Sequence, residues 1–339
     1  MAEYLRLHGG TDELGVPEHD FSTNSNACGP CPAALEAVRA ADASRYPDPG
    51  YRELRTALAA FHGVEPDRIV LAGSASEFIF RVSALAARAG CQSRQSSATY
   101  AVPEHAYGDY AQAARAWGLE LVDSASDARL IWACEPSSPL GQAHAGLQLQ
   151  VDALRQHQWL VLDRAYAPLR LQGRSSLDAA GLDWVWQLWT PNKALGLTGV
   201  RAAYAIAPLQ TGDSVEQLQA LAPSWPVGAH GVAMLQAWTS AAAQAWLVAS
   251  LAILRDWKQR QLDLCQSLGW QLLPSDANYF VARPASPDLG HDLGRLRRQG
   301  IKLRDAGSFG LPGCVRLGVL APAAQDALAL AWKEIERSI

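Results

Sequence analysis

Lysine is scarce in this chain of 339 residues: only four of its 29 basic residues are lysine, and the others are arginine. Arginine replaces lysine wherever a plain positive charge suffices, but it cannot serve as an amine nucleophile, because that role requires the loss of a proton. Lys193 is the only lysine in the first 257 residues, whereas Lys258, Lys302 and Lys333 come later. The scarcity of lysine therefore makes Lys193 a candidate nucleophile.

Charge, cysteine and long apolar runs are limited as well. Charged residues make up 18% of the sequence and the net charge is −4, so nothing favours nucleic acid or an anionic membrane surface as a partner. The N-terminus lacks a basic region followed by an apolar run, and no stretch indicates a membrane span. The six cysteines are scattered, which is typical of reduced thiols. These absences predict a cytoplasmic protein that binds neither nucleic acid nor membranes.

The tetrapeptide Cys28-Gly29-Pro30-Cys31 is that of thioredoxin-like oxidoreductases, so a thiol redox protein is one alternative. A thioredoxin-like domain would place it between a strand and a helix, but an irregular segment rich in Asn and Ser precedes it here. A zinc site needs about four ligands, and the sequence has no second C-x-x-C or H-x-x-H pair. We therefore expect no metal and interpret this stretch as a loop that leads into a helix. Cys31, near the start of that helix, is expected to have a reactive thiol without a redox function.

Apolar strands alternate with helices along residues 69–208. This alternation predicts an α/β fold in three layers, with helices on both faces of a mostly parallel sheet. An Ala-rich helix is expected over 228–263, and the less regular remainder predicts a smaller α+β domain. We expect an N-terminal arm with part of the small domain in 1–44, the large domain in 45–228, and the linking helix with the rest of the small domain in 229–339. The expected strands are 69–73, 98–104, 128–136, 159–166, 183–190 and 201–208, and the expected helices include 32–41, 51–63, 76–90, 107–118 and 151–158.

Polar residues follow several of these strands, at the sheet edge where open α/β folds bind ligands. The turn Gly73-Ser74-Ala75-Ser76-Glu77 opens a helix and is either an anion site or an ordinary tight turn. Asp163 ends a strand and needs a cation or a donor, which a ring nitrogen or a structural salt bridge would supply. Tyr107 begins a helix, where its ring either covers a flat cofactor or packs in the core.

Two further loops follow predicted strands and carry candidate ligand-binding residues. Lys193 lies in Thr190-Pro191-Asn192-Lys193 and is followed by Gly199-Val200-Arg201, so its amine lies close in sequence to two residue types that hold phosphates, unless it is a surface lysine. Residues 135–141 read Glu-Pro-Ser-Ser-Pro-Leu-Gly, a loop of restricted shape or a plain turn. An amine that accepts an aldehyde, a carboxylate for a ring nitrogen, a stacking ring and phosphate anchors together match the needs of pyridoxal 5′-phosphate (PLP).

At this point the chain resembles fold-type I PLP-dependent enzymes of the class I/II aminotransferase superfamily over nearly all of its length. The run T-P-N-K-A-L-G-L-T-G-V-R resembles the S/T-x-x-K…G-x-R motif of the family, and L-D-R-A-Y resembles D-x-A-Y. The resemblance implies that Lys193 forms a Schiff base with PLP, that Asp163 binds the ring nitrogen, and that Tyr166 binds the phenolic oxygen. The phosphate and ring contacts that it implies are Ser74, Ala75, Ser76, Tyr107, Thr190 and Arg201.

The same resemblance extends to the subunit interface and the small domain. The run Y-P-D-P resembles the segment whose tyrosine, here Tyr46, reaches the phosphate in the partner subunit, which implies a homodimer with shared active sites. The runs D-A-N-Y-F and C-V-R-L-G-V imply Asn278 near the substrate and Arg316 on its carboxylate. The family usually has N-P-x-N-P-x-G, whose second Asn binds the phenolic oxygen, and here Ser138 occupies that position.

The N-terminus and residues 308–318 resemble the group of L-threonine-O-3-phosphate decarboxylases. The similar N-terminal runs are L-H-G-G and D-F-S-T-N-S-N. We therefore expect a decarboxylase that converts this small-molecule substrate to aminopropanol phosphate in cobalamin biosynthesis, with substrate contacts at His8, Gly9, Asn26 and Arg304. The main alternative is a class I/II aminotransferase such as histidinol-phosphate aminotransferase, which needs the same residues. A non-catalytic protein of the PLP fold is a further alternative.

Overall fold

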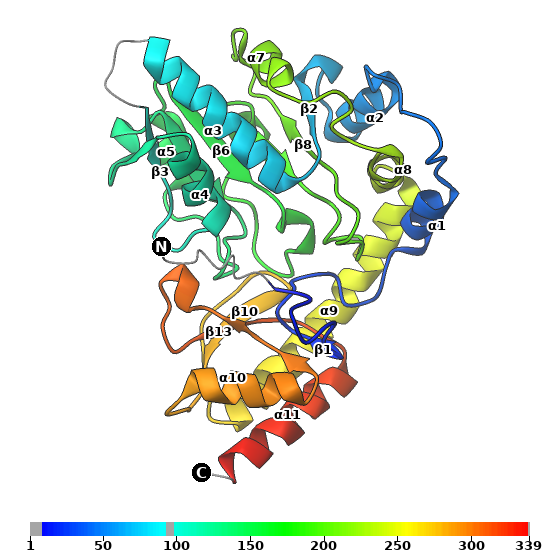
Figure 1. The fold of residues 1–339 in the computed structure, drawn as a ribbon, viewed down its shortest axis with the longest axis vertical. Helices are drawn as coiled ribbons and strands as arrows, with labels where there is room; N and C mark the ends of the chain where they lie inside the picture. Colours follow the sequence, from blue (N-terminus) through cyan, green and yellow to red (C-terminus); the bar gives the residue numbers. More distant parts are fainter. Residues whose placement is uncertain (1–8, 93–97, 338–339) are drawn as a thin grey trace.

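A seven-stranded sheet forms the centre of the larger part of the molecule (Figure 1). The computed structural model of the chain describes residues 9–92 and 98–337. Along the sheet the strands run in the order β2-β8-β7-β6-β5-β3-β4, and β8 is antiparallel to both of its neighbours while the other pairs are parallel. The mostly parallel sheet predicted from the sequence is thus confirmed. The strands are β2 (Ile69–Ala72), β3 (Thr99–Ala101), β4 (Glu120–Leu121), β5 (Leu130–Cys134), β6 (Trp159–Asp163), β7 (Trp186–Trp189) and β8 (Ala203–Ile206).

Helices cover both faces of this sheet because alternate residues of each central strand are buried on opposite sides. In β6, for example, Val161 packs in one cluster with Phe78 and Ala113, whereas Leu160 packs in another with Leu147. The first face is covered by α3 (Ala75–Gln92), α4 (Gly108–Ala116) and α7 (Ser214–Ala220). The opposite face is covered by α1 (Pro32–Ala40), α2 (Arg52–His62), α5 (Leu147–Asp152), α6 (Ala179–Leu182) and α8 (Ala229–Trp238). The result is the expected three-layer α/β/α arrangement.

The helix expected over 151–158 is wrong, because α5 ends at Asp152. The side chain of Gln158 fixes a turn in its place: it accepts a hydrogen bond from the Arg155 N–H at 3.0 Å and donates to the Ala128 carbonyl at 2.7 Å. A buried amide that bonds the backbone just before β5 outweighs the local helical pattern.

The long helix expected over 228–263 is divided in two. Ser240 separates α8 from α9 (Ala241–Ser267), and its hydroxyl caps α9 by accepting a hydrogen bond from the Ala243 N–H at 3.2 Å. The two helices meet at an angle of 70°. Among the described residues, no single helix is both long enough and apolar enough to cross a membrane. The bent pair α8 and α9 meets these two criteria only when the helices are counted together.

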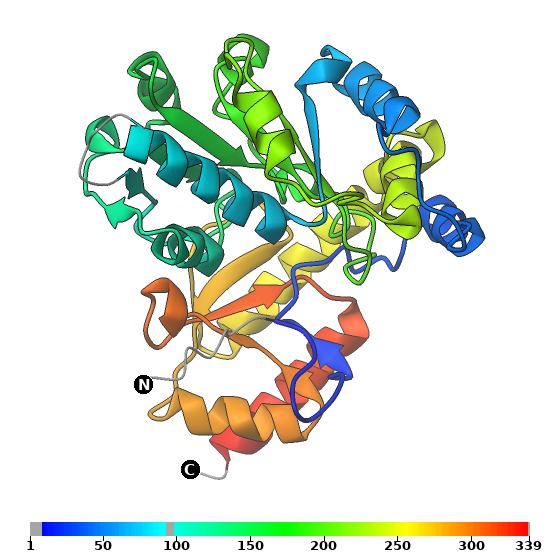
Figure 2. The same ribbon diagram turned by 45° about the horizontal axis from the view of Figure 1, so that its top comes forward.

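A smaller sheet lies at the far end of α9, in the lower half of Figure 1 and from another side in Figure 2. Its four strands run in the order β12-β13-β10-β9, and the separate parallel pair β1-β11 joins the N-terminal arm to this part of the molecule. The boundaries expected near residues 44 and 228 stay predictions. The elements are β1 (His19–Asp20), β9 (Gln271–Leu272), β10 (Tyr279–Arg283), α10 (Leu289–Arg298), β11 (Ile301–Lys302), β12 (Arg304–Asp305), β13 (Val315–Gly318) and α11 (Pro322–Glu336).

His62, at the end of α2, makes the stability of the fold depend on pH. Its Nε2 lies 2.7 Å from the Tyr204 hydroxyl, and burial, with the positive charge of Arg164, lowers the pKa of His62 from its ordinary value of 6.5 to about 4. The unfolded chain therefore takes up a proton between pH 6.5 and 4 that the folded chain excludes, so the free energy of unfolding falls as the pH falls through that range. Urea unfolding at pH 7 and pH 4.5 measures how much the free energy of unfolding falls between these two pH values. We expect a smaller fall for His62→Gln than for the wild type. Equal falls would show that His62 is not the source of the pH dependence.

Candidate active site

A cavity of about 870 Å³ lies between the carboxyl ends of the large-sheet strands and the small sheet. Lys193, Asp163 and Tyr166 line it on the side of the large sheet, and Arg304 and Arg316 line it on the side of the small sheet. The other predicted site residues in its wall are Gly9, Ala75, Ser76, Tyr107, Ser138, Thr190 and Arg201. Chain segments that are distant in sequence therefore meet at the sheet edge where open α/β folds bind ligands.

Asp163 presents a buried carboxylate at the end of β6, with 6% of the residue exposed. The Tyr110 hydroxyl donates to its Oδ2 at 2.7 Å, and the Ala165 N–H donates to its Oδ1 at 2.9 Å. Burial raises the pKa of Asp163, while these two hydrogen bonds and the charge of Lys193 oppose that rise. Because a buried charge is costly unless it is paired, a cationic group in the cavity would stabilise this carboxylate.

The loop that carries Lys193 is held by the N-terminal segment. The Lys193 carbonyl accepts from the Asn26 N–H at 2.9 Å, and the Leu195 carbonyl accepts from the Cys31 N–H at 2.8 Å. Gly196 has a φ of +68°, and a Cβ there would lie 2.6 Å from the Gly29 carbonyl oxygen, so the close approach requires glycine. The Lys193 ammonium lies 5.4 Å from the centre of the Tyr166 ring.

Small residues form the turn between β2 and α3 that leads to the cavity. A Cβ at Gly73 would lie 2.8 Å from the Pro226 carbonyl oxygen, so this position admits only glycine without a shift. The Ser74 hydroxyl caps α3 by accepting from the Glu77 N–H at 3.0 Å, and it lies outside the cavity wall. Ala75 and Ser76 are in the wall, in the first turn of α3, where backbone N–H groups lack helical acceptors. Such a turn suits a phosphate group.

Arg304 and Arg316 lie directly opposite each other on the antiparallel strands β12 and β13. Both guanidinium groups lie over the ring of Phe309, at 4.9 and 5.5 Å from its centre. Burial, followed by the charge of Arg316, lowers the pKa of Arg304. Like charges at opposed positions of two strands destabilise the pairing, and a bound anion relieves that repulsion.

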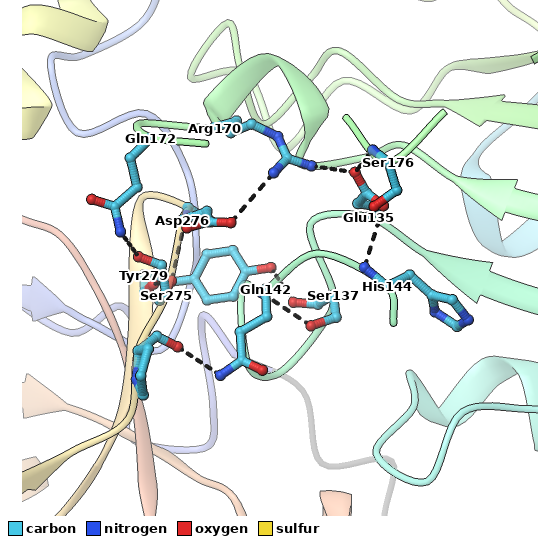
Figure 3. Close-up of polar contacts among 12 residues, drawn as sticks. Glu135, Ser137, Gln142, His144, Arg170, Gln172, Ser176, Ser275, Asp276 and Tyr279 are labelled. Atoms are coloured by element: carbon cyan, nitrogen blue, oxygen red, sulfur yellow. Dashed lines mark hydrogen bonds and ion pairs between the residues drawn. The ribbon is translucent and has the colours of Figure 1, made fainter. Parts of the chain in front are cut away.

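Ser138 belongs to a loop after β5 that is fixed by a network around Glu135 (Figure 3). The Glu135 carboxylate, on a residue only 3% exposed, accepts from Arg170 at 2.7 Å and from the Ser176 N–H at 2.8 Å. Arg170 also pairs with Asp276 at 3.4 Å, on the segment before β10. The network therefore ties the loop to the small sheet.

The Ser138 hydroxyl itself accepts from Arg316 Nη1 at 3.3 Å, and the Ser22 carbonyl accepts from Nη2 of the same arginine at 3.0 Å. Both partners are neutral oxygens, so these bonds fix the direction of the guanidinium without neutralising its charge. Ser138, which stands where the family usually has asparagine, is therefore engaged with Arg316.

Other predicted residues lie away from the cavity wall. Tyr46 is 78% exposed and stacks on Trp225, with ring centres 4.3 Å apart. Asn26 is buried, and its amide donates to the Ala194 carbonyl at 3.1 Å and to the Ser250 hydroxyl at 2.8 Å. Asn278 is fully buried and donates to the Ser25 carbonyl at 3.0 Å. His8 is outside the described residues.

Asn24 and Tyr110 are among the residues of the cavity wall that sequence reasoning missed. Asn24 is 2% exposed, and its Nδ2 lies 3.4 Å from the Tyr166 hydroxyl. Within residues 9–92 and 98–337, its Oδ1 and Arg316 Nε are buried without a hydrogen-bond partner. The sequence has only four asparagines, and this scarcity was a signal that could have pointed to Asn24.

The prediction of a reactive thiol at Cys31 is wrong, because this residue is fully buried at the start of α1. Cys28 is half-buried, burial raises the pKa of its thiol, and both cysteines are free. Over the described part of the chain, no three His, Cys, Asp or Glu side chains are grouped to hold a metal ion. The backbone of the Cys28–Cys31 loop instead supports the Lys193 loop.

These residues fit PLP by their chemistry. The buried carboxylate of Asp163 suits a protonated ring nitrogen, and the start of α3 suits a phosphate. Asn24 and Arg316, each with one orphaned polar atom, line the same cavity as Lys193. The fold and the cavity thus define a PLP-dependent enzyme of fold type I. A family model described as "Aminotransferase class I and II" matches residues 17–331, and the chain belongs to this family. Its cofactor is PLP.

Individual relatives agree with this assignment. The chain is 30% identical over 325 residues to a histidinol-phosphate aminotransferase of Jannaschia sp., covering 89% of this chain and 87% of that protein. The crystal structure of histidinol-phosphate aminotransferase from Sinorhizobium meliloti with pyridoxal-5'-phosphate has a TM-score of 0.80 at 23% identity, covering 93% of this chain and 90% of that one. L-threonine-O-3-phosphate decarboxylase from Porphyromonas gingivalis has a TM-score of 0.75 at 19% identity, covering 94% and 99%.

The expectation that the chain is primarily a threonine-phosphate decarboxylase is wrong. Further relatives at 27 to 29% identity over most of the chain share the description histidinol-phosphate aminotransferase. The decarboxylase is a structural neighbour whose low identity reflects the common fold alone. A resemblance of short terminal motifs on a shared fold does not by itself decide between reactions on one cofactor.

Proposed function

We propose that this chain is a PLP-dependent aminotransferase whose amino substrate carries a phosphate, in the manner of histidinol phosphate. One observation carries the proposal: the Lys193 amine shares a cavity with the buried carboxylate of Asp163 and with the opposed pair Arg304 and Arg316. The first two groups suit the cofactor, and the arginine pair suits an anionic group on the substrate. The relatives at 27 to 30% identity support this substrate class.

PLP supplies the aldehyde and the electron-accepting ring that transamination requires. In the proposal, Asp163 holds the ring nitrogen and keeps its proton, and Tyr166 donates its hydroxyl proton to the phenolic oxygen. Ser76, Thr190 and Arg201 hold the cofactor phosphate, and Tyr107 covers the ring. Lys193 Nζ, which lies 5.4 Å from the centre of the Tyr166 ring, moves a proton at the substrate α-carbon.

Arg304 and Arg316 hold the anionic group of the substrate. Two like charges on opposed strands bind an anion with a gain that a single arginine lacks, because the anion also removes their mutual repulsion. Asn24 lies on the same wall, and its Nδ2 lies 3.4 Å from the Tyr166 hydroxyl. Gly9 allows close approach in this region, since a Cβ there would lie 2.2 Å from the Ser22 carbonyl oxygen.

The substrate proposal is tested by incubating the PLP-loaded protein with histidinol phosphate and a 2-oxo acid, and measuring the amino acid formed. We expect turnover that needs both substrates, with kcat/KM at least about tenfold lower for histidinol without its phosphate, since the arginine pair then lacks its anion. Arg304→Gln is expected to reduce that preference. Turnover that ignores the phosphate would contradict the substrate class while leaving the aminotransferase reaction intact.

The proposal includes a homodimer in the cytoplasm, with active sites shared between subunits. The exposed pair of Tyr46 and Trp225 supports a covered surface, and the free thiols of the described cysteines support a reducing compartment. Mixing Lys193→Ala and Tyr46→Ala subunits is expected to restore activity, because one of the two sites in each mixed dimer then has both residues. No recovery above the Tyr46→Ala parent would place Tyr46 outside the partner's site.

A further inference from the structure

Tyr110 presents a hydroxyl that the reaction scheme above does not use. The residue is fully buried in α4, lines the cavity, and donates to Asp163 Oδ2 at 2.7 Å. Its ring is held on two sides, because it stacks on Trp132 with ring centres 4.3 Å apart and meets Tyr107 edge-on at 5.7 Å. A side chain fixed in this way delivers its hydroxyl to one point with little loss of entropy on binding.

We propose that Tyr110 is a positioning residue for the cofactor, which orients the Asp163 carboxylate and keeps it ionised toward the ring nitrogen of PLP. The inference rests on the proposed role of Asp163. Oδ2 accepts from Tyr110 and Oδ1 accepts from the Ala165 N–H, so two donors on opposite sides of the carboxyl group fix its plane. A hydrogen bond to a charged acceptor is stronger than one to a neutral acceptor, so the pair favours the carboxylate over the acid.

The ionisation of Asp163 depends on several elements packed around it. Burial disfavours the carboxylate, Lys193 favours it, and the thiol of Cys134 on β5 lies close enough for the negative charge of Asp163 to raise the pKa of that thiol. Tyr279 on β10 is also affected by the charge of Asp163. Among these groups, Tyr110 and Ala165 bond the carboxylate directly, and only Tyr110 does so through a side chain that mutation can remove.

The alternative role for Tyr110 is packing alone. Phenylalanine keeps the stacked ring and removes the hydroxyl, so Tyr110→Phe separates the two roles. Tyr204→Phe is the matched control: Tyr204 is also fully buried, and its hydroxyl is bonded to His62 at 2.7 Å and to Trp238 at 3.1 Å, outside the residues that line the cavity. Both variants lose one buried hydroxyl with its hydrogen bonds, but only Tyr110→Phe loses a bond to Asp163.

The test measures the dissociation constant of PLP from the apo protein by quenching of tryptophan fluorescence, at intervals between pH 5 and 9. Tyr110→Phe is expected to raise this constant about tenfold at neutral pH and to move the acidic limit of tight binding upward by about one pH unit, because the carboxyl group loses a bond that favours its charged form. Tyr204→Phe is expected to lower the unfolding temperature without moving either quantity. If Tyr110→Phe matches Tyr204→Phe, or weakens PLP equally at every pH, the inference is wrong.

A double-mutant cycle provides a second test. Asp163→Asn has no charge for Tyr110 to favour, so adding Tyr110→Phe to it is expected to weaken PLP binding by less than about twofold more. Fully additive losses would overturn the inference. Asp163→Asn alone tests the proposed function: if it leaves PLP binding unchanged, the proposed role of Asp163 fails, whereas a loss with Asp163→Asn but none with Tyr110→Phe rejects only the role of Tyr110.

Discussion

Lys193→Ala is expected to abolish amino-group transfer, with kcat reduced by at least about a thousandfold, because in the proposed reaction the amine both bonds the cofactor and moves a proton. No other described lysine lines the cavity. Lys258 donates to the Ala277 carbonyl at 2.8 Å and Lys302 pairs with Asp12 at 2.9 Å, so both are committed elsewhere. The measurement is turnover with histidinol phosphate, together with the absorbance spectrum of the PLP-loaded protein.

Lys193→Arg makes this prediction sharper. Arginine preserves the positive charge but does not lose its proton, so it is expected to be as inactive as alanine. Lys333→Arg, in α11, is the control and is expected to keep full activity. Activity within about tenfold of the wild type in Lys193→Arg would show that the amine is not the reacting group.

Arg170→Met is expected to lower the free energy of unfolding by about 3–5 kcal/mol, because it leaves the buried carboxylate of Glu135 without its cation. Glu135 is only 3% exposed, and its partner Arg170 also reaches Asp276, so one substitution disrupts both pairs. Urea unfolding of the apo protein at pH 7 measures the change. Since this network fixes the loop of Ser138, we also expect weaker substrate binding.

An exposed ion pair gives the matched control. Arg45 and Asp42 pair at 3.5 Å, but their side chains are 85% and 57% exposed, so Arg45→Met is expected to cost less than about 1 kcal/mol. The double variant Glu135→Gln with Arg170→Met removes both buried charges of the main pair and is expected to recover part of the lost stability. If Arg170→Met lowers the free energy of unfolding no more than Arg45→Met does, the buried pair of Glu135 and Arg170 does not stabilise the fold as argued.

Much of the fold was predictable because its strands are short, apolar and regularly spaced. The strand ending at Asp163 and the loop of Lys193 could be placed from the sequence, since hydrophobic pattern and a rare residue type are local signals. The prediction of a helix at 151–158 was wrong because Gln158 bonds the backbone just before β5, about 30 positions away. The prediction of one long helix over 228–263 was wrong because Ser240 caps a new helix within an alanine-rich stretch.

The candidate site was predictable to the extent that motifs carry it. The opposition of Arg304 and Arg316 follows from the register of β12 and β13, which the sequence does not specify. Tyr110 reads as an ordinary core tyrosine of a helix until the position of Asp163 is known. Cys31 shows the opposite error, because a conspicuous motif suggested chemistry where the fold uses only the backbone of the loop.

The walls of the cavity come from both ends of the polypeptide. Arg316 donates to the carbonyl of Ser22, a contact that spans 294 positions of the sequence. Contacts of such long range form late, because the entropy of closing a long loop has to be met before they contribute stability. During synthesis the N-terminal segment is released long before strand β13, which follows it by almost 300 positions. The substrate side of the cavity is therefore complete only after β13 has been made and paired, so we expect binding of the substrate anion by Arg304 and Arg316 to depend on a later step of folding than the cofactor contacts of the large sheet.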